Sequence, residues 1–506
     1  SNSSERNVTL VLDKPAPRTD AATRAQSAAR PAVSLSCRVG LRERLAVLRG
    51  ARMRIASEPG AFVDACRLPW RNRDAETLLA EVMPLCDAMR WLEKHAARTL
   101  RDRRVGLKGR PMTSWGVRSG VRREPVGRVL VIGPGNYPLL LPGVQAVQAY
   151  AAGNRVSIKP APGSRAVMER LVKRLRDAGM EFGAIEVLAE DPAEASAKIE
   201  AGEVDKVFFT GSDRSGRAVM RQLADHGIPS VMELSGCDAM LVLEDADMDR
   251  VIAALRMGLR FNASQTCIAP RRVLVHEARY DELCRRIAEV VRGIEPADVP
   301  AATVEKLEVL TRDAESGGAR RLSGQEQEIA SPMPPLVLAD VSPSAAIADA
   351  DVFAPVVSLM RCEGEQAMLD AYAQCGYRLG ASVFGKRNAG AIADKLDAGH
   401  VVVNDLIAPT ADPRLPFPAR GSSGLGSTRG PEGLLEMTQA KAVIRRRGKL
   451  LPHLDEPHPS DDALAVALLR ARHGQSLRTR LAAWSELIRL GRDRSRLSDD
   501  AGANES

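Results

Sequence analysis

Apolar and polar residues follow a helical pattern in the first part of the chain. Residues 1 to about 30 are rich in Ser, Asn, Ala, Pro and Arg without periodicity, which predicts a loosely ordered arm. From Leu41 to Leu100 apolar residues recur every three or four positions, so we expect two or three amphipathic helices. The polar stretch 110–124, with two glycines and alternating valines, predicts a hairpin.

From Pro125 the pattern changes to short apolar runs separated by helical segments. Strands are predicted at 129–132, 155–158, 185–188, 206–209 and 230–234, with helices between them that include 192–200 and 213–226. This alternation predicts a parallel sheet with helices on both faces. Ligands of such sheets bind beyond the carboxyl ends of the strands. In this chain those ends carry residues 133–136, Lys159, residues 210–212 and Glu233.

A turn of small and polar residues at 257–270 contains Cys267, between the end of a predicted helix and a strand at 271–276. A cysteine in such a turn can hold a reactive thiolate, although free cysteines are more often buried and structural. Lys159 and Glu233 likewise have ordinary alternatives, as a surface lysine and a paired carboxylate. The glycines at 133 and 135 resemble a dinucleotide-binding turn, but Pro138 replaces the third glycine of that fingerprint.

The last part of the chain has a different pattern. Residues 453–462 are polar with two prolines and predict a linker. Residues 463–490 predict a basic amphipathic helix, or a pair of helices broken at Gly474. We expect this tail to pack against the body of the protein or a sister subunit. Binding to a membrane surface is the alternative.

Composition narrows the class of protein. A chain of 506 residues with 44% apolar residues can form about two to four domains with sizeable cores. The net charge of +8 comes from interspersed charges and only 3% of residues are aromatic, which does not favour nucleic-acid binding. The eight cysteines form no Cys-x-x-Cys pair, so neither a metal site nor a disulfide framework is expected. No leader-like segment or long apolar run is present, so we expect a cytoplasmic protein without an integral membrane segment.

Seven separated motifs follow the order and approximate spacing of the aldehyde dehydrogenase superfamily, which residues 40 to 445 resemble. The motifs are Pro134-Gly135-Asn136-Tyr137-Pro138, Ile158-Lys159-Pro160, Phe209-Thr210-Gly211-Ser212, Glu233-Leu234-Ser235-Gly236, Gln265-Thr266-Cys267, Phe353-Ala354-Pro355 and Ser423-Gly424-Leu425-Gly426. The resemblance implies an α/β fold with a discontinuous Rossmann-type cofactor domain at 31–109 and 126–233. It further implies an α/β catalytic domain at 234–404 and a small β element for oligomerisation at 110–125 and 405–450. Residues 451–506 would form the linker and tail, and a homodimer or homotetramer is expected.

The resemblance also implies a reaction and a set of site residues. Cys267 would be the nucleophile that forms a thiohemiacetal and then a thioester, and Asn136 would stabilise the oxyanion. Glu233 would be the base that activates water to release a carboxylic acid. The cofactor would be NAD or NADP, and no metal is implied. The implied cofactor-binding residues are Ile132, Gly133, Pro134, Lys159, Gly211, Ser212, Leu234, Asp351 and Phe353.

Departures from the family pattern keep several alternatives open. Pro162 stands where the family commonly has a glutamate that contacts the adenosine ribose, so NADP is as open as NAD. An acylating or semialdehyde-specific member is an alternative that Glu233 disfavours, because such members typically lack this base. A second alternative is a catalytically silent scaffold. The presence of Asn136, Glu233 and Cys267 disfavours it. The expected entrance is mostly apolar and favours a hydrophobic aldehyde; it is formed by Tyr137, Leu141, Phe261, Ile268 and residues 407–416.

Overall fold

The computed structural model describes residues 39–71, 73–111, 114, 116–323, 329–447, 453–454 and 456–503, with side chains up to residue 492. The chain divides into two compact units. The first comprises residues 1–104 and 120–443, and the second comprises residues 105–119 and 444–506. The arm predicted for residues 1–30 lies outside the described residues.

The first sheet of the larger unit has the strand order β16-β7-β6-β3-β4-β5. Its parallel strands are β3 (Arg128–Ile132), β4 (Arg155–Lys159), β5 (Ile185–Val187), β6 (Lys206–Thr210) and β7 (Ser230–Glu233). The short strand β16 (Gly424–Leu425) pairs antiparallel with β7. These bounds confirm the predicted parallel sheet and place the carboxyl ends of β3, β4, β6 and β7 at one edge.

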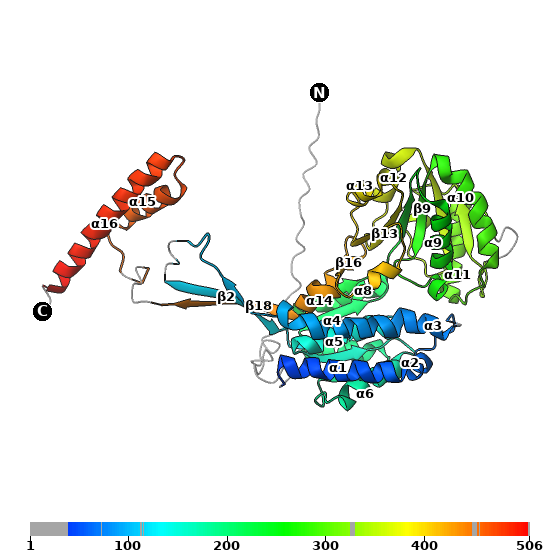
Figure 1. The fold of residues 1–506 in the computed structure, drawn as a ribbon, viewed down its shortest axis with the longest axis horizontal. Helices are drawn as coiled ribbons and strands as arrows, with labels where there is room; N and C mark the ends of the chain where they lie inside the picture. Colours follow the sequence, from blue (N-terminus) through cyan, green and yellow to red (C-terminus); the bar gives the residue numbers. More distant parts are fainter. Residues whose placement is uncertain are drawn as a thin grey trace, which may run out of the picture. The chain divides into compact units, whose positions relative to one another are not determined.

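Helices cover both faces of this sheet. One face packs against α1 (Leu41–Ser57), α4 (Met83–Thr99), α5 (Leu140–Ala152) and α6 (Arg165–Asp177), which run side by side in Figure 1. The other face packs against α7 (Pro192–Glu200) and α8 (Asp213–His226), whose bounds agree with the predicted helices. Helix α5 is buried along its whole length, because its sequence is apolar except for Gln145 and Gln148, which donate hydrogen bonds to Thr210 Oγ1 and the Gly430 carbonyl oxygen.

The N-terminal helices form a chain of short segments before α4. Helix α2 (Pro59–Ala65) follows α1, and α3 (Asp74–Thr77) continues into a π-helical turn, η2 (Leu78–Val82), that leads directly into α4. The predicted helical pattern to Leu100 is thus confirmed. The π-helical turn is a local departure of the kind that often occurs at functional sites, and it contains the buried Glu81.

The second sheet has the order β10-β11-β12-β9-β8-β13-β14, parallel except for β10. Its strands are β8 (Asp238–Val242), β9 (Pro270–His276), β10 (Arg320–Arg321), β11 (Leu336–Ala339), β12 (Val356–Cys362), β13 (Gly380–Phe384) and β14 (His400–Val403). Helices α9 (Met248–Arg260) and α10 (Glu277–Val290) pack on one face, and α11 (Ala301–Ser316), α12 (Gly364–Ala373) and α13 (Ala389–Ala393) pack on the other. Figure 1 shows α9 and α10 opposite α12 and α13 across β9 and β13.

Residues after β14 return to the first sheet and close the larger unit. Strands β15 (Phe417–Pro418) and β17 (Ser427–Thr428) form a two-stranded sheet, and α14 (Gly430–Glu436) follows. Between them, Gly424 lies opposite Glu233 in the β16–β7 pair. A Cβ atom at Gly424 would lie 1.9 Å from the Met232 carbonyl oxygen, so only glycine allows this close approach. Short 3-10 turns occur at η5 (Val291–Gly293), η6 (Ala346–Asp349) and η7 (Ala408–Ala411).

A three-stranded sheet connects β1 (Arg103–Val105), β2 (Val117–Pro125) and β18 (Thr438–Arg446), in that order. The hairpin predicted within residues 110–124 is therefore wrong in its bounds. Residues 117–125 form a single strand, and its partners lie before residue 106 and after residue 437. The alternating valines correctly indicated a strand, but the pattern of one strand does not identify its partner.

The described part of the smaller unit contains two helices, α15 (Asp461–His473) and α16 (Leu477–Ala503). They confirm the predicted pair broken at Gly474, where a Cβ atom would lie 2.6 Å from the Arg470 carbonyl oxygen. Ala467, Ala471 and Ala483 are buried between them. Among all described helices, none has the length and hydropathy needed to cross a membrane.

Candidate active site

The turn that carries Cys267 is strained just before the cysteine. After α9 ends, the chain passes through η4 (Phe261–Ser264) and reaches β9 at Pro270. Asn262, Ala263 and Ser264 have φ angles of 52°, 51° and 59°, in the left-handed region. Each such residue costs about 1–3 kcal/mol and persists only where its surroundings hold it. The contacts that hold this turn are therefore part of the site.

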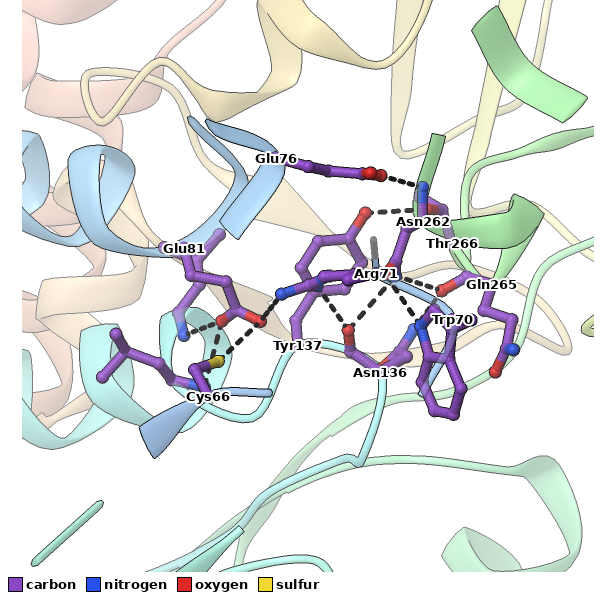
Figure 2. A network of polar contacts seen from close by, with 12 residues as sticks. Cys66, Trp70, Arg71, Glu76, Glu81, Asn136, Tyr137, Asn262, Gln265 and Thr266 are labelled. Atoms are coloured by element: carbon purple, nitrogen blue, oxygen red, sulfur yellow. Dashed lines mark hydrogen bonds and ion pairs between the residues drawn. The ribbon is translucent and has the colours of Figure 1, made fainter. Parts of the chain in front are cut away.

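Asn262 is the residue through which those contacts act. Its Oδ1 accepts hydrogen bonds from Trp70 Nε1 at 2.9 Å and from Arg71 Nε at 2.7 Å. Its backbone N–H donates to the Glu76 carboxylate. Its Nδ2 donates to the carbonyl oxygens of Asn136 and Gln265, at 3.2 Å and 3.0 Å. Figure 2 shows this side chain between the N-terminal segment and the loops of Asn136 and Gln265.

Arg71 and Glu81 form a buried ion pair behind Asn262. Arg71 Nη1 donates to Glu81 Oε1 at 2.7 Å, and Nη2 donates to the Asn136 carbonyl oxygen at 2.8 Å. Glu81 Oε2 accepts from the backbone N–H groups of Leu139 and Leu140, at 3.0 Å and 2.7 Å. Burial raises the pKa of Glu81, while Arg71 and these N–H groups oppose the shift. The pair thus fixes the loop from Asn136 to the start of α5.

The same contacts bring the side chain of Asn136 onto the turn of Cys267. Asn136 Nδ2 donates to the Gln265 carbonyl oxygen at 2.9 Å. The hydroxyls of Tyr137 and Thr266 lie 2.7 Å apart. Two predicted site residues separated by 131 positions, Asn136 and Cys267, are therefore neighbours in the fold. A side-chain amide at this place can donate to an oxyanion that forms on a carbon bound to the cysteine sulfur.

Glu233 ends β7 and is 2% exposed. Its Oε2 accepts a hydrogen bond from Thr210 Oγ1 at 3.1 Å, across the β6–β7 pair. Burial raises the pKa of Glu233, and the Arg429 guanidinium and the hydroxyls of Thr210 and Thr428 oppose the shift. A carboxyl group with a raised pKa is suited to accept a proton near neutral pH.

The Cys267 thiol is half-buried and electrostatically linked to Glu233. Burial is the main cause that raises the pKa of this thiol, and the negative charges of Glu233 and Asp238 add to it. Arg429 opposes them and lowers the pKa. The ionisation of Cys267 thus depends on the charges of Glu233, Asp238 and Arg429.

Cys267 lines an apolar cavity of about 360 Å³. The residues expected at the entrance, Tyr137, Leu141, Phe261, Ile268 and Ile407, all line this cavity. The other lining residues are Leu79, Ala80, Pro84, Leu140, Met257, Thr266, Ala408, Thr410, Ala411, Phe417 and Arg429. Arg429 is the one charged side chain among them. This size and lining suit the hydrocarbon part of a small organic molecule.

A second cavity, of about 450 Å³, lies at the carboxyl ends of β3, β4 and β6. Six of the nine predicted cofactor-binding residues line it: Ile132, Gly133, Pro134, Lys159, Gly211 and Ser212. Lys159 is 5% exposed, and burial lowers the pKa of its amino group, with Glu190 and Asp191 opposing the shift. Hydroxyl groups of a ribose would provide acceptors for this desolvated ammonium group. Ser212 caps the 14-residue helix α8, whose N-terminus favours phosphate groups.

The other three predicted cofactor-binding residues do not line this cavity. Leu234 is buried, and its N–H donates to the Ser423 carbonyl oxygen at 2.9 Å. Asp351 has its carbonyl oxygen bonded by Lys306 Nζ at 2.6 Å. Burial raises the pKa of the Asp351 carboxyl, while Ser235, Arg271 and Lys306 oppose the shift and Asp213 of α8 adds to it. Phe353 is partly buried. Asp351 is thus linked electrostatically to the first residue of α8.

The sequence did not identify several residues of this site: Arg71, Glu81, Asn262 and Arg429. Arg71 and Glu81 lie in a helical pattern in which charged residues normally face solvent. Thr210 belongs to one of the family motifs, but its hydrogen bond to Glu233 depends on the register of β6 and β7. Among the described residues, no group of three or more His, Cys, Asp or Glu side chains is arranged to hold a metal ion. The seven described cysteines are free thiols.

The arrangement of two sheets, a cysteine turn and a cavity at the strand ends has a direct match among known families. Residues 6–443 match the model of the aldehyde dehydrogenase family, so the chain belongs to that family. It is 30% identical over 419 residues to a 4,4'-diapolycopene aldehyde oxidase from Methylomonas, covering 81% of this chain and 78% of the relative. It is also 30% identical to a protein from Pseudomonas aeruginosa described as a probable coniferyl aldehyde dehydrogenase, with coverages of 80% and 86%.

A solved structure supports the same assignment. A Mycobacterium tuberculosis aldehyde dehydrogenase complexed with NAD+ is similar with a TM-score of 0.73 and 25% identity, covering 82% of this chain and 87% of that one. The protein is therefore an enzyme that oxidises an aldehyde to a carboxylic acid, and its cofactor is NAD or NADP. These findings confirm the expected family, fold class and reaction.

Proposed function

We propose that Cys267, Asn136 and Glu233 carry the aldehyde oxidation, and that the substrate is a hydrophobic aldehyde. The observation that carries this proposal is the position of Cys267 at the wall of an apolar cavity, with the turn before it bonded by Asn136 Nδ2 and with Glu233 close enough to affect its ionisation. Cys267 would supply the nucleophile and Glu233 the base that the reaction needs in one water-poor place.

The first step is attack by the Cys267 thiolate on the carbonyl carbon of the aldehyde. The resulting thiohemiacetal carries a negative charge on oxygen. Asn136 Nδ2 and the Cys267 backbone N–H donate to that oxygen, and one such donor contributes about 3–4 kcal/mol to the transition state. The contacts of Arg71 and Asn262 with the Asn136 carbonyl oxygen keep this amide in place.

A nicotinamide cofactor would supply the hydride acceptor that oxidation of the aldehyde requires. Residues at the strand ends would hold it: Lys159 would bond the adenosine ribose, and Gly211 and Ser212 at the start of α8 would face the phosphates. We infer that Asp351 contacts the nicotinamide ribose. Glu233 then takes a proton from water, which attacks the thioester and releases the acid and the free thiol.

The substrate class follows from the cavity. Its lining is almost entirely apolar, and a volume of about 360 Å³ accommodates an aromatic or a medium-length aliphatic aldehyde. The relative from Pseudomonas aeruginosa is described as acting on coniferyl aldehyde. Burial of such a molecule contributes roughly 25 cal/mol per Å² of apolar surface. We therefore expect KM to decrease as the hydrophobic part of the aldehyde grows.

We further propose that the protein is a homodimer or homotetramer in the cytoplasm. Support for association comes from exposed apolar residues at 4-3-4 spacing along α16: Leu477, Leu481, Trp484 and Ile488. This spacing places them on one stripe of the helix, as in helices that pair. The free thiols of the described cysteines fit a reducing compartment.

The test is cofactor reduction, followed by absorbance, with NAD and NADP and with aliphatic and aromatic aldehydes of increasing size. We expect turnover that rises with hydrophobic size and that falls more than about 1000-fold in Cys267→Ala. Cys86→Ala, which removes a half-buried thiol on α4, serves as the matched control and should retain turnover. Turnover that survives Cys267→Ala, or a preference for small polar aldehydes, contradicts the proposal.

A further inference from the structure

Arg429 is an unusual residue for the wall of an apolar cavity. It lines the cavity of Cys267 together with aliphatic and aromatic side chains. Its backbone has a φ of 61°, in the left-handed region, directly before α14. A non-glycine residue in this conformation is costly and needs local support. The chain thus places a guanidinium in a setting where an apolar side chain would be less costly to bury.

Two contacts fix the direction of this guanidinium. Arg429 Nη1 donates to the Thr410 carbonyl oxygen at 3.0 Å. The Cζ atom of the same side chain lies 4.7 Å from the centre of the Phe417 ring, in a cation–π contact. Thr410 and Phe417 themselves line the cavity. The cation is therefore held at the cavity wall, on a residue that is half-buried.

Among the charges around the Cys267 thiol, the Arg429 guanidinium is the main one that favours the thiolate. Glu233 of β7 and Asp238 of β8 act against ionisation of Cys267, and Tyr137 and Arg271 also interact with it. Arg429 also faces His400 of β14, and burial together with Arg429 lowers the pKa of that imidazole to about 4. Arg429 acts in favour of the ionised form of both Cys267 and Glu233. No ion pair joins Arg429 to a carboxylate within the described residues, so its charge is not neutralised by a direct partner.

We propose that Arg429 is a positioning residue whose guanidinium stabilises the thiolate of Cys267 and keeps Glu233 in its carboxylate form. This inference rests on the proposed roles of Cys267 and Glu233. It explains how a thiol and a carboxyl group that are both desolvated, and that repel each other when charged, ionise in one site. The Arg429 cation, which acts on both groups, compensates part of the desolvation and part of the repulsion.

The experiment measures the thiolate directly, without turnover. The rate of Cys267 alkylation by neutral iodoacetamide and by anionic iodoacetate is followed between weakly acid and alkaline pH in wild type, Arg429→Met and Arg429→Lys. Thiolate absorbance in the ultraviolet, corrected with Cys267→Ala, is recorded over the same range. Methionine keeps the length of the side chain, and all variants share the same backbone strain.

We expect Arg429→Met to lower the iodoacetamide rate about tenfold near neutral pH, which corresponds to an upward shift of about one pH unit in thiolate formation. Arg429→Lys should retain most of the wild-type rate, because it keeps the charge. Arg420→Met is the matched control: Arg420 is exposed and pairs with Asp397 at 3.2 Å. It should leave both rates unchanged.

Two results would overturn the inference. An unchanged iodoacetamide rate with a lower iodoacetate rate would mean that Arg429 binds anions and does not act on the thiol. A lysine variant as slow as the methionine variant, with the absorbance titration unshifted, would mean that the side chain acts through packing alone. Failure of the proposed function is distinguishable, since it appears as turnover in Cys267→Ala, whereas this test measures alkylation in the resting enzyme.

Discussion

Glu233 illustrates how one side chain depends on three elements of the fold. It ends β7, accepts a hydrogen bond from Thr210 of β6, and lies opposite Gly424 of β16. Its burial raises its pKa, so the carboxylate form, which alone can accept a proton, is lost as pH falls through that raised value. The rate of thioester hydrolysis should therefore decline toward acid pH earlier than it would for an exposed glutamate.

Replacing the Glu233 carboxyl group separates formation of the thioester from its hydrolysis. In Glu233→Gln we expect a burst of one reduced cofactor for each Cys267, followed by a steady rate at least about 100-fold below wild type, because water is no longer activated. Stopped-flow absorbance measures the burst, and mass spectrometry identifies the acyl group left on Cys267. Glu186→Gln, on β5, is the control with unchanged kinetics. Loss of the burst itself would show that Glu233 is needed before the thioester forms.

At the scale of elements, the segment from Trp70 to Glu81 acts as a clamp on the catalytic turn. Three consecutive left-handed residues precede Cys267 in sequence, and their strain is offset by the contacts of Asn262 with Trp70, Arg71 and Glu76. Arg71 also bonds the Asn136 carbonyl oxygen. This N-terminal segment therefore positions both the proposed nucleophile and the proposed oxyanion donor, although neither belongs to it.

Breaking the clamp should reduce the rate more than the affinity. In Arg71→Met we expect kcat to fall about 100-fold, because a displacement of about 1 Å in catalytic groups costs that much, with a small change in KM. The buried Glu81 also loses its partner, which lowers stability by about 3–5 kcal/mol. Steady-state kinetics and thermal unfolding measure the two effects.

A matched pair separates catalysis from stability in this experiment. Arg52 and Glu93 form another partly buried ion pair, at 2.6 Å, between α1 and α4. Arg52→Met should lower the unfolding temperature and leave kcat nearly unchanged. If Arg71→Met lowers kcat no more than Arg52→Met does, the clamp has no role beyond stability. Figure 2 shows the contacts that Arg71→Met removes.

The contacts of the clamp could not be predicted from the sequence, because they join residues far apart in the chain. Strand ends at Lys159, Thr210 and Glu233 were predictable because a strand and the turn after it are local patterns. Asn262 lies 191 positions from Arg71, and their contact depends on how two sheets pack. The burial of Glu81 was hidden by a helical pattern that allows an exposed glutamate. The partner of β2 was misassigned for the same reason, since one strand does not encode its neighbour.

In the candidate site, too, local motifs could be predicted from the sequence and long-range contacts could not. The family motifs pointed to Cys267, Asn136 and Glu233 because each belongs to a short local motif. In the structure Asn136 bonds the turn of Cys267, and Glu233 acts electrostatically on that thiol. Arg429 belongs to no such string. Its relevance depends on the direction of its side chain into the cavity, which is fixed by Thr410 and Phe417. A residue such as Arg429, which belongs to no local motif, could therefore be recognised only from the structure.

At the scale of the whole molecule, the two units carry separate properties. All residues that line the two cavities belong to the unit of residues 1–104 and 120–443. The other unit carries the apolar stripe of α16, in which Leu477 is 76% exposed and Leu481 is 67% exposed. Large apolar side chains this exposed, at helix-pairing spacing, support the proposed association through α16.

Removal of residues 453–506 should therefore change assembly and leave the reaction intact. We expect turnover within about twofold of wild type, because no cavity residue is lost, and a smaller mass by light scattering, because burying the stripe contributes roughly 25 cal/mol per Å² to association. A full-length variant with Leu477→Glu and Leu481→Glu should give the same shift in mass, whereas Arg478→Glu with Arg480→Glu, beside the stripe, should not. An unchanged mass in both the deletion and the leucine variant would exclude α16 from the interface. Loss of turnover on deletion would show instead that the smaller unit supports the active site.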